Sequence, residues 1–207
     1  RNTDWHAVAR WGRHTGARAG LAIASIVTDA VEIHASVLRA EKLDRYVEKD
    51  SSPRIKAGYG GWQSLIGLGW TSENQLSLMM EYWHDSRAPS KERWRQWLNQ
   101  AASLPVNLPC DTRIGQLADS AKPLTSTNLQ RDNVLFRASW TDNRWTPSVD
   151  MLYMPADHGR ITTISLGWQG DVLGIEGGWR SFDGPRTAIA HNLPDQSRAY
   201  FWVKYPF

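Results

Sequence analysis

The chain has 207 residues, with 24 Lys and Arg against 21 Asp and Glu and a net charge of +3. So small an excess, without a dense basic run, argues against a nucleic-acid partner. No apolar stretch of about 18 residues occurs, which excludes a transmembrane helix, and the single cysteine, Cys110, excludes an intrachain disulfide. Tryptophan is the compositional outlier, at 12 residues.

Period-two alternation of apolar and polar residues runs along most of the chain. In the segment WHAVARW, Trp5 and Trp11 share one face while His6 and Arg10 share the other. Such alternation predicts strands with two unlike faces, and the chain, 1–207, is expected to be a single all-β domain. The ten expected strands are 4–12, 18–27, 31–43, 56–71, 75–85, 130–141, 145–155, 161–169, 172–181 and 197–207.

Short turns and longer connections alternate between these strands. Four dipeptides predict tight turns: Thr28-Asp29, Glu73-Asn74, Asp142-Asn143 and Gly170-Asp171. The other connections are the longer loops 45–54, 86–129 and 182–196 and the short segments 14–17 and 158–159. Short turns at one end and mostly longer loops at the other are typical of an outer-membrane barrel.

The longest connection, 86–129, contains the sequence SKERWRQWLNQAASL. Ser90 suits a helix N-cap, and Trp94 and Trp97 fall on one helical face, which predicts a short amphipathic helix over 90–104. Tryptophan rings beside arginines suit contact with a protein partner or with lipopolysaccharide phosphates.

Aromatic residues bracket the apolar face of single strands. Trp62 and Trp70 are eight residues apart, a distance that climbs roughly 20 Å when the strand is tilted by about 40°. This is close to the height of the apolar band of a bilayer, so we expect the face to contact lipid, although alternation alone also fits a soluble β-barrel or sandwich. The expected lipid-interface aromatics are Trp5, Trp11, Trp62, Trp70, Trp140, Trp145, Tyr153, Trp168, Trp179 and Phe207.

The opposite face carries charges of both signs in the middle of the strands. A membrane barrel places such residues in a polar lumen. The expected lumen-lining residues are Arg10, Glu32, His34, Glu81, Arg131, Arg137, Asp150, Glu176, Arg180, Arg198 and Lys204.

The last ten residues, RAYFWVKYPF, alternate aromatic or apolar residues with basic and polar ones. Through Phe201, Val203, Tyr205 and Phe207 they resemble the β-signal of Gram-negative outer-membrane β-barrel proteins. The resemblance implies a transmembrane antiparallel up-and-down barrel in the bacterial outer membrane, surrounded by outer-membrane lipid and lipopolysaccharide. It also implies that the barrel-assembly machinery reads the terminal strand. The ten strands are either a complete small barrel or the C-terminal part of a larger one.

A polar, arginine-rich lumen favours a passive channel or transporter, because charges lining a pore set its selectivity. Ten closed strands enclose a narrow space that side chains can fill, so a pore fits best if the chain is part of a larger barrel. The six histidines are scattered without ligand spacing, so neither a metal site nor another cofactor is expected.

Two alternatives remain open. His34 and Ser36 form a His-x-Ser pair that, with Glu48, resembles outer-membrane phospholipases and lipid A deacylases, where His takes the serine proton and a third group orients it. In those families the pair faces lipid, whereas the alternation here turns His34 and Ser36 to the lumen, and Glu48 falls in an expected loop. The other alternative is a structural or assembly scaffold that binds a partner through 86–129.

Overall fold

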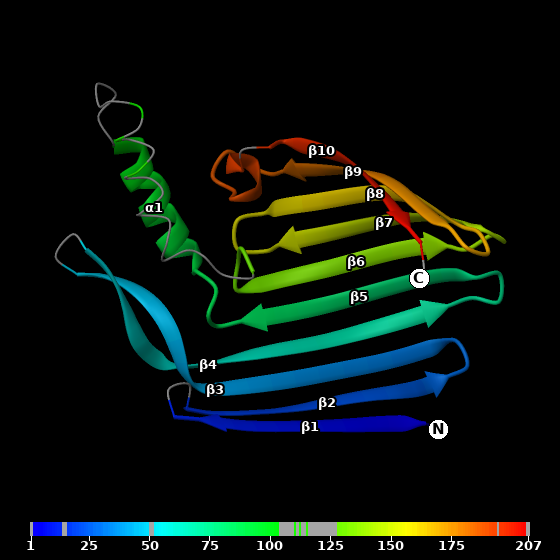
Figure 1. Ribbon diagram of the computed structural model, residues 1–207, viewed down its shortest axis with the longest axis horizontal. Helices are drawn as coiled ribbons and strands as arrows, with labels where there is room; N and C mark the ends of the chain where they lie inside the picture. The colour runs from blue at the N-terminus through cyan, green and yellow to red at the C-terminus, as the bar shows by residue number, and fades with distance from the viewer. Residues whose placement is uncertain are drawn as a thin grey trace.

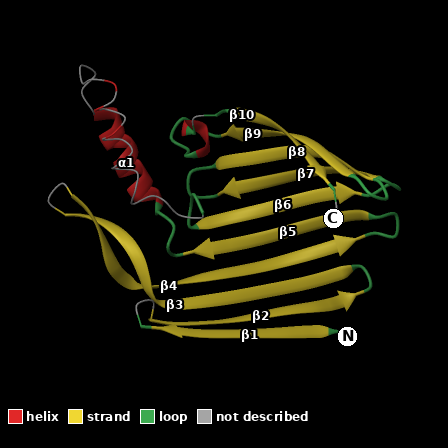
Figure 2. Cartoon of the chain, in the orientation of Figure 1, coloured by secondary structure: helices red, strands yellow, loops and turns green. Residues whose placement is uncertain are grey.

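The computed structural model describes residues 2–13, 16–49, 52–103, 110, 112, 115, 128–193 and 195–205, apart from the side chains of 43–49, 52–59 and 101. Ten strands form one antiparallel sheet in chain order, which confirms the all-β class and the up-and-down topology (Figure 1). The helical elements are α1 (Lys91–Ser103) and the short 3-10 helix η2 (Ala190–Asn192) (Figure 2). The strands are β1 Thr3–Gly12, β2 Gly16–Thr28, β3 Val31–Lys49, β4 Ser52–Thr71, β5 Leu76–Asp85, β6 Asp132–Trp140, β7 Trp145–Met154, β8 Gly159–Gln169, β9 Gly174–Asp183 and β10 Ser197–Lys204.

The main departure from the expected boundaries is the hairpin of β3 and β4. Segment 45–54 is predicted as a loop, but β3 continues to Lys49 and pairs there with Ser52 of β4. The prediction was wrong because this charged stretch has no apolar alternation, whereas the hydrogen-bonded ladder is made by the backbone and needs none. The hairpin projects beyond the ends of the other strands (Figure 1).

Connections of different length lie at the two ends of the sheet (Figure 1). At the short-turn end, β2–β3, β4–β5, β6–β7 and β8–β9 are joined, and both chain termini lie there as well. Gln75 and Asn143 adopt φ values of 62° and 54° in two of these turns, a left-handed conformation that permits a tight reversal. We call the other end, which holds α1, η2 and the end of β3 at Lys49, the loop end.

The register keeps one set of side chains on the same face across the sheet. Trp5 of β1 pairs with Ile23, and this row continues through Ala35 and Ile66 to Tyr82 of β5. We call the face of this row the apolar face and the opposite one the polar face. The registers of the remaining strand pairs continue both faces from β5 to β10.

Burial on these two faces is inverted relative to a sheet that folds in water. On the apolar face, Ile66 is 62% exposed and Ile164 is 58% exposed. On the polar face, Ser148, Thr163 and Ser165 are buried. A sheet stabilised in water by a hydrophobic core buries its apolar side chains instead.

The sheet is open at both edges. Within the described strands, β1 pairs only with β2 and β10 only with β9, although the sheet curls strongly (Figure 1). The two unpaired edges run antiparallel to each other, since ten strands alternate in direction. Among the described residues, no helix has the length and apolar character needed to cross a bilayer.

Candidate functional site

The centre of the polar face is a network of cross-strand contacts between β6 and β9. Arg137 Nη1 lies 3.4 Å from Asp150 Oδ1, its direct partner on β7. Arg180 Nε donates to Thr163 Oγ1 at 2.9 Å. In this half of the polar face, each of these arginines therefore finds its partner, a carboxylate or a hydroxyl, on the neighbouring strand.

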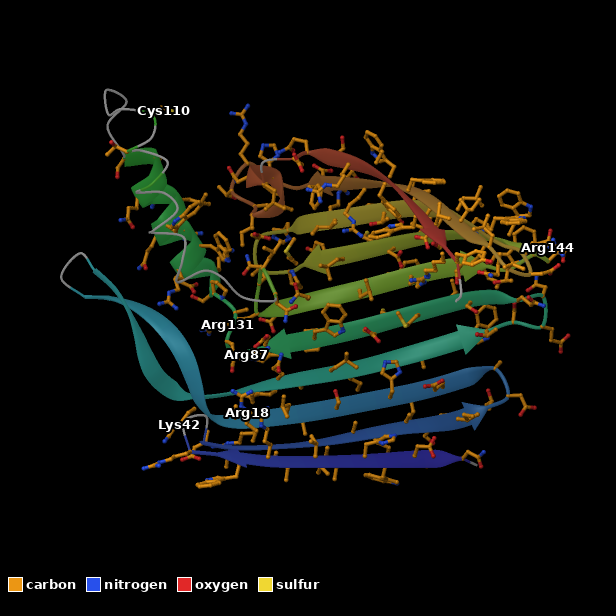
Figure 3. The ribbon with its side chains drawn as sticks, in the orientation of Figure 1. Arg18, Lys42, Arg87, Cys110, Arg131 and Arg144 are labelled. Carbon is orange, nitrogen blue, oxygen red and sulfur yellow. The ribbon has the colours of Figure 1, made fainter. Side chains whose placement is uncertain are left out.

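The expected lumen residues fall on this polar face with one exception. Arg131 precedes β6, and its Nε donates to the carbonyl oxygen of Ala88 at 3.0 Å, so it joins two loop segments. Figure 3 shows it beside Arg87 at the loop end. The register places the remaining ten on the polar face: Arg10, Glu32, His34, Glu81, Arg137, Asp150, Glu176, Arg180, Arg198 and Lys204.

A second polar cluster bridges three strands over a glycine. His34 Nε2 of β3 lies 2.9 Å from Glu81 Oε1 of β5, and Trp83 Nε1 donates to Glu81 Oε2 at 2.8 Å. Gly67 of β4 lies between them in register with both. A Cβ at Gly67 would be 2.2 Å from His34 Nε2, so the missing side chain is what lets the two residues meet.

The terminal strand is attached through a similar arrangement. Tyr200 of β10 lies over its partner Gly178 and donates its hydroxyl to Glu176 Oε1 at 2.9 Å. A Cβ at Gly178 would stand 2.5 Å from Tyr200 Cζ. The aromatic ring thus fills the space of an absent side chain, which fixes the register of β10.

Near the loop end, the polar face of β1–β5 is hollowed by a cavity of about 420 Å³. Polar side chains reach it from His6, Ser36, Gln63 and Asn128, whereas the rest of its wall on the polar face is mainly apolar. The sequence analysis missed it, because alternation reports the face of a residue and not the depth of the surface. The apolar wall residues are Val8, Gly20, Ala22, Leu38 and Leu65.

Asp85, the buried last residue of β5, organises the loop end beside this cavity. Arg87 Nη2 and Nε donate to its two carboxylate oxygens at 2.8 and 2.9 Å, and Gln63 and Asn128 add bonds at 3.0 Å each. Burial disfavours the charged carboxylate, but the hydrogen bonds from Arg87 and Asn128 outweigh it and lower the pKa of Asp85 below its ordinary value.

A buried carboxylate also joins three connections at the loop end. Asp157 Oδ2 accepts hydrogen bonds from Gln130 Nε2 and from the backbone N–H of Ile189, both at 2.9 Å. Its Oδ1 accepts from the backbone N–H of Gly159 at 2.9 Å. The loops before β6, between β7 and β8, and between β9 and β10 are therefore held at one point.

At the loop end, the apolar face of the sheet also ends in a polar cluster. Tyr82 donates its hydroxyl to Asp132 Oδ1 at 2.6 Å, and His84 Nδ1 lies 2.8 Å from the same oxygen. Trp62 stacks on His84 with ring centroids 4.4 Å apart. This combination of rings and hydrogen-bonding groups suits a boundary between apolar and wet surroundings.

The expected interface aromatics within the described residues lie on the apolar face. At the short-turn end, Trp140 Nε1 donates to the carbonyl oxygen of Asn74 at 3.0 Å, and Trp145 pairs with Trp168. Phe201 and Val203 of the terminal motif lie on this face of β10, whereas Phe207 is outside the described residues.

The structure does not bring the three catalytic candidates together. His34 and Ser36 share the polar face, but His34 Nε2 faces Glu81 and Ser36 borders the cavity. Glu48 lies on β3, not in the expected loop, twelve residues beyond Ser36. Glu48 is fourteen residues beyond His34, which corresponds to about 46 Å along the strand, too far for Glu48 to orient His34.

In the helical segment, Ser90 caps α1 as expected, its Oγ accepting from the backbone N–H of Arg93 at 3.4 Å. Cys110 is exposed as a free thiol. Across the described ranges, no group of three His, Cys, Asp or Glu residues is placed to hold a metal ion. No protein-family model matches this sequence, and no curated protein matches it either.

Proposed function

We propose that this chain forms the wall of a transmembrane β-barrel in the outer membrane of a Gram-negative bacterium and serves as a passive channel or transporter. The observation that carries the proposal is the inverted burial of the two faces. Large apolar side chains remain exposed on one face of the sheet, while hydroxyl and amide side chains of β6, β7 and β8 are buried on the other. An exposed apolar surface that continues over several strands marks contact with lipid or with another protein.

Three further features support a membrane over a protein partner. Short turns join the strands at one end and longer loops at the other. Aromatic rings with hydrogen-bonding edges lie at both ends of the apolar face, as Trp62 and Trp140 illustrate. The open edges of β1 and β10 have the relative direction that closure requires, either with each other or through further strands.

The polar face supports a channel function. Charges of both signs, such as Arg137 and Glu81, would line the lumen and bias which ions pass. Arg137 is paired with Asp150 and Glu81 with His34 on the sheet, and a pore fits best if further strands complete a larger barrel.

The barrel is tested by expressing the chain with an outer-membrane leader in a Gram-negative host. We expect outer-membrane fractions to contain a band whose migration on a gel changes on boiling, because a closed barrel resists detergent until heated. A folded protein in the soluble fraction would overturn the membrane assignment.

The channel is tested by conductance in planar bilayers. Arg137→Ala should shift ion preference toward cations and Glu81→Gln toward anions, because each removes one sign of lumen charge. Arg144→Ala is the matched control, since Arg144 lies in a turn 3.1 Å from Asp171. A heat-modifiable barrel without conductance would refute the channel and leave the barrel standing.

A further inference from the structure

The cavity near the loop end is unlike the rest of the polar face. Elsewhere that face carries charged pairs and hydroxyls, but here Val8, Leu38 and Leu65 form an apolar wall. Its volume of about 420 Å³ lies in the lower part of the range of small-molecule sites, about 300–1,000 Å³. Ion conduction alone does not require an apolar wall.

Gly20 keeps the cavity open. A Cβ at this position would lie 2.9 Å from Leu38 Cδ1 and 3.2 Å from Val8 Cγ1. Any larger residue would therefore push these two side chains out of place. The apolar hollow depends on a residue that contributes no side chain of its own.

Two arginines stand next to this hollow without a counter-charge. Arg10 of β1 and Arg18 of β2 are direct register partners on the polar face. Like charges directly opposite each other destabilise a sheet, yet no described carboxylate lies within ion-pair distance of either one. The Nε of Arg18 is buried and has no hydrogen-bond partner, a costly state for a charged donor.

The arginine pair and the cavity are adjacent along the strands. Val8 and Gly20 are also register partners, two residues from Arg10 and Arg18, which corresponds to a separation of about 7 Å. On the far wall, the charge of Asp85 is already balanced by Arg87. The uncompensated charge is thus positive and lies at one end of an apolar hollow.

We propose that this part of the lumen binds a medium-chain alkyl carboxylate, with its chain in the cavity and its carboxylate between Arg10 and Arg18. A neutral apolar ligand would leave the arginines unpaired, and an inorganic anion would leave the apolar wall in water. The cavity volume suits one chain and not the two chains of a phospholipid. The inference rests on the barrel proposed above, because only there is the polar face a lumen.

The test uses decanoate with a photoreactive diazirine at its chain end, added to the protein in lipid vesicles. Crosslinked positions are mapped by mass spectrometry at residue resolution. Alternation makes the readout specific, since Leu38 and Leu65 line the cavity while Ile33 and Ile66 lie on the opposite face of the same two strands. Labelling of Ile33 and Ile66 reports probe dissolved in lipid, and labelling of Leu38 and Leu65 reports bound probe.

We expect saturable labelling of Leu38 and Leu65 that excess decanoate prevents and excess decyl alcohol does not. Replacing Arg10→Gln and Arg18→Gln together should raise the half-saturating concentration by about tenfold or more, because two charge-assisted contacts are lost. Arg39→Gln is the matched control, since Arg39 is the register partner of Ala19 on the opposite face. Ala22→Phe should abolish cavity labelling, and Ala19→Phe should not.

The outcomes separate this inference from the barrel. Labelling of Ile33 and Ile66 without Leu38 and Leu65 would overturn the ligand and leave the barrel intact. Absence of labelling at all four positions would overturn both. Cavity labelling that is insensitive to Arg10→Gln and Arg18→Gln would overturn the proposed carboxylate site.

Discussion

His34 and Glu81 come within 2.9 Å of each other although a complete strand separates β3 from β5. The contact passes over Gly67, which is in register with both residues. Side chains two strands apart are ordinarily kept from meeting by the residue between them. The absent side chain of Gly67 is therefore as much a part of this cluster as its two charged members.

Gly67→Ala should destabilise the protein by about 1–2 kcal/mol, because the new methyl group displaces His34 and breaks its contact with Glu81. The free energy of unfolding in urea, measured in lipid vesicles, checks this. Gly69→Ala is a closely matched control on the same strand and face, where a Cβ would meet no atom nearer than 4.0 Å. Equal effects of the two substitutions would contradict the argument.

Gly178→Ala should loosen the terminal strand. Its methyl group would overlap the ring of Tyr200 and break the hydrogen bond from Tyr200 to Glu176. Backbone amides of β10 should then exchange with deuterium faster than in the unchanged protein. At Gly177 a Cβ makes only an ordinary 3.9 Å contact with Phe201, so Gly177→Ala should leave exchange in β10 unaltered.

Asp157→Ala should release the connections at the loop end. The substitution removes acceptors from Gln130, Ile189 and Gly159, and unsatisfied buried donors of this kind cost about 2–4 kcal/mol in sum. We expect faster tryptic cleavage at Arg186, in the loop between β9 and β10. Asp171→Ala, at an exposed turn, is the control; cleavage unchanged by Asp157→Ala would refute the role of this carboxylate.

Ile66→Lys distinguishes lipid from water around the apolar face. Ile66 is already exposed, so in water a lysine there should be nearly neutral. In a bilayer the same change should cost about 2–4 kcal/mol. Val172→Lys, at a similarly exposed residue in a short turn, should cost less than about 0.5 kcal/mol in either case. A neutral Ile66→Lys in vesicle unfolding would remove the support for a lipid-facing surface.

The segment after β5, which Asp85 holds through Arg87, should detach from the sheet only at low pH. The folded pKa of Asp85 is lowered, so its charged form stabilises the fold above the ordinary carboxylate range near pH 4. That stabilisation is lost as pH falls through the lowered folded value. Deuterium exchange at Arg87 and Ala88 should therefore stay slow down to about pH 4 and rise below it.

Two variants check that Asp85 causes this rise in exchange at low pH, which we call the acid step. Asp85→Asn should make exchange at Arg87 and Ala88 fast at neutral pH and remove the step. Asp171→Asn should leave the step in place, because Asp171 lies in an exposed turn at the opposite end of the sheet. Retention of the step in Asp85→Asn would show that another group titrates there.

Alternation was sufficient to find all ten strands and to place ten of the eleven expected lumen residues on one face. It succeeded because side-chain direction in a strand has a period of two, which sequence displays directly. It failed at 45–54, where charged residues continue a ladder that only backbone pairing sustains. It also misplaced Arg131, which precedes β6 and belongs to a loop.

What the sequence by itself determined is the all-β class, the order of the strands and the division into two unlike faces, because these follow from local periodicity and turn residues. What only the tertiary structure decided is which residues meet across strands: His34 with Glu81 over Gly67, Arg10 opposite Arg18, and the three loops at Asp157. Register and the absence of a side chain at particular glycines set these contacts. Neither is visible in the period of a single strand, because each depends on the alignment of one strand with the next.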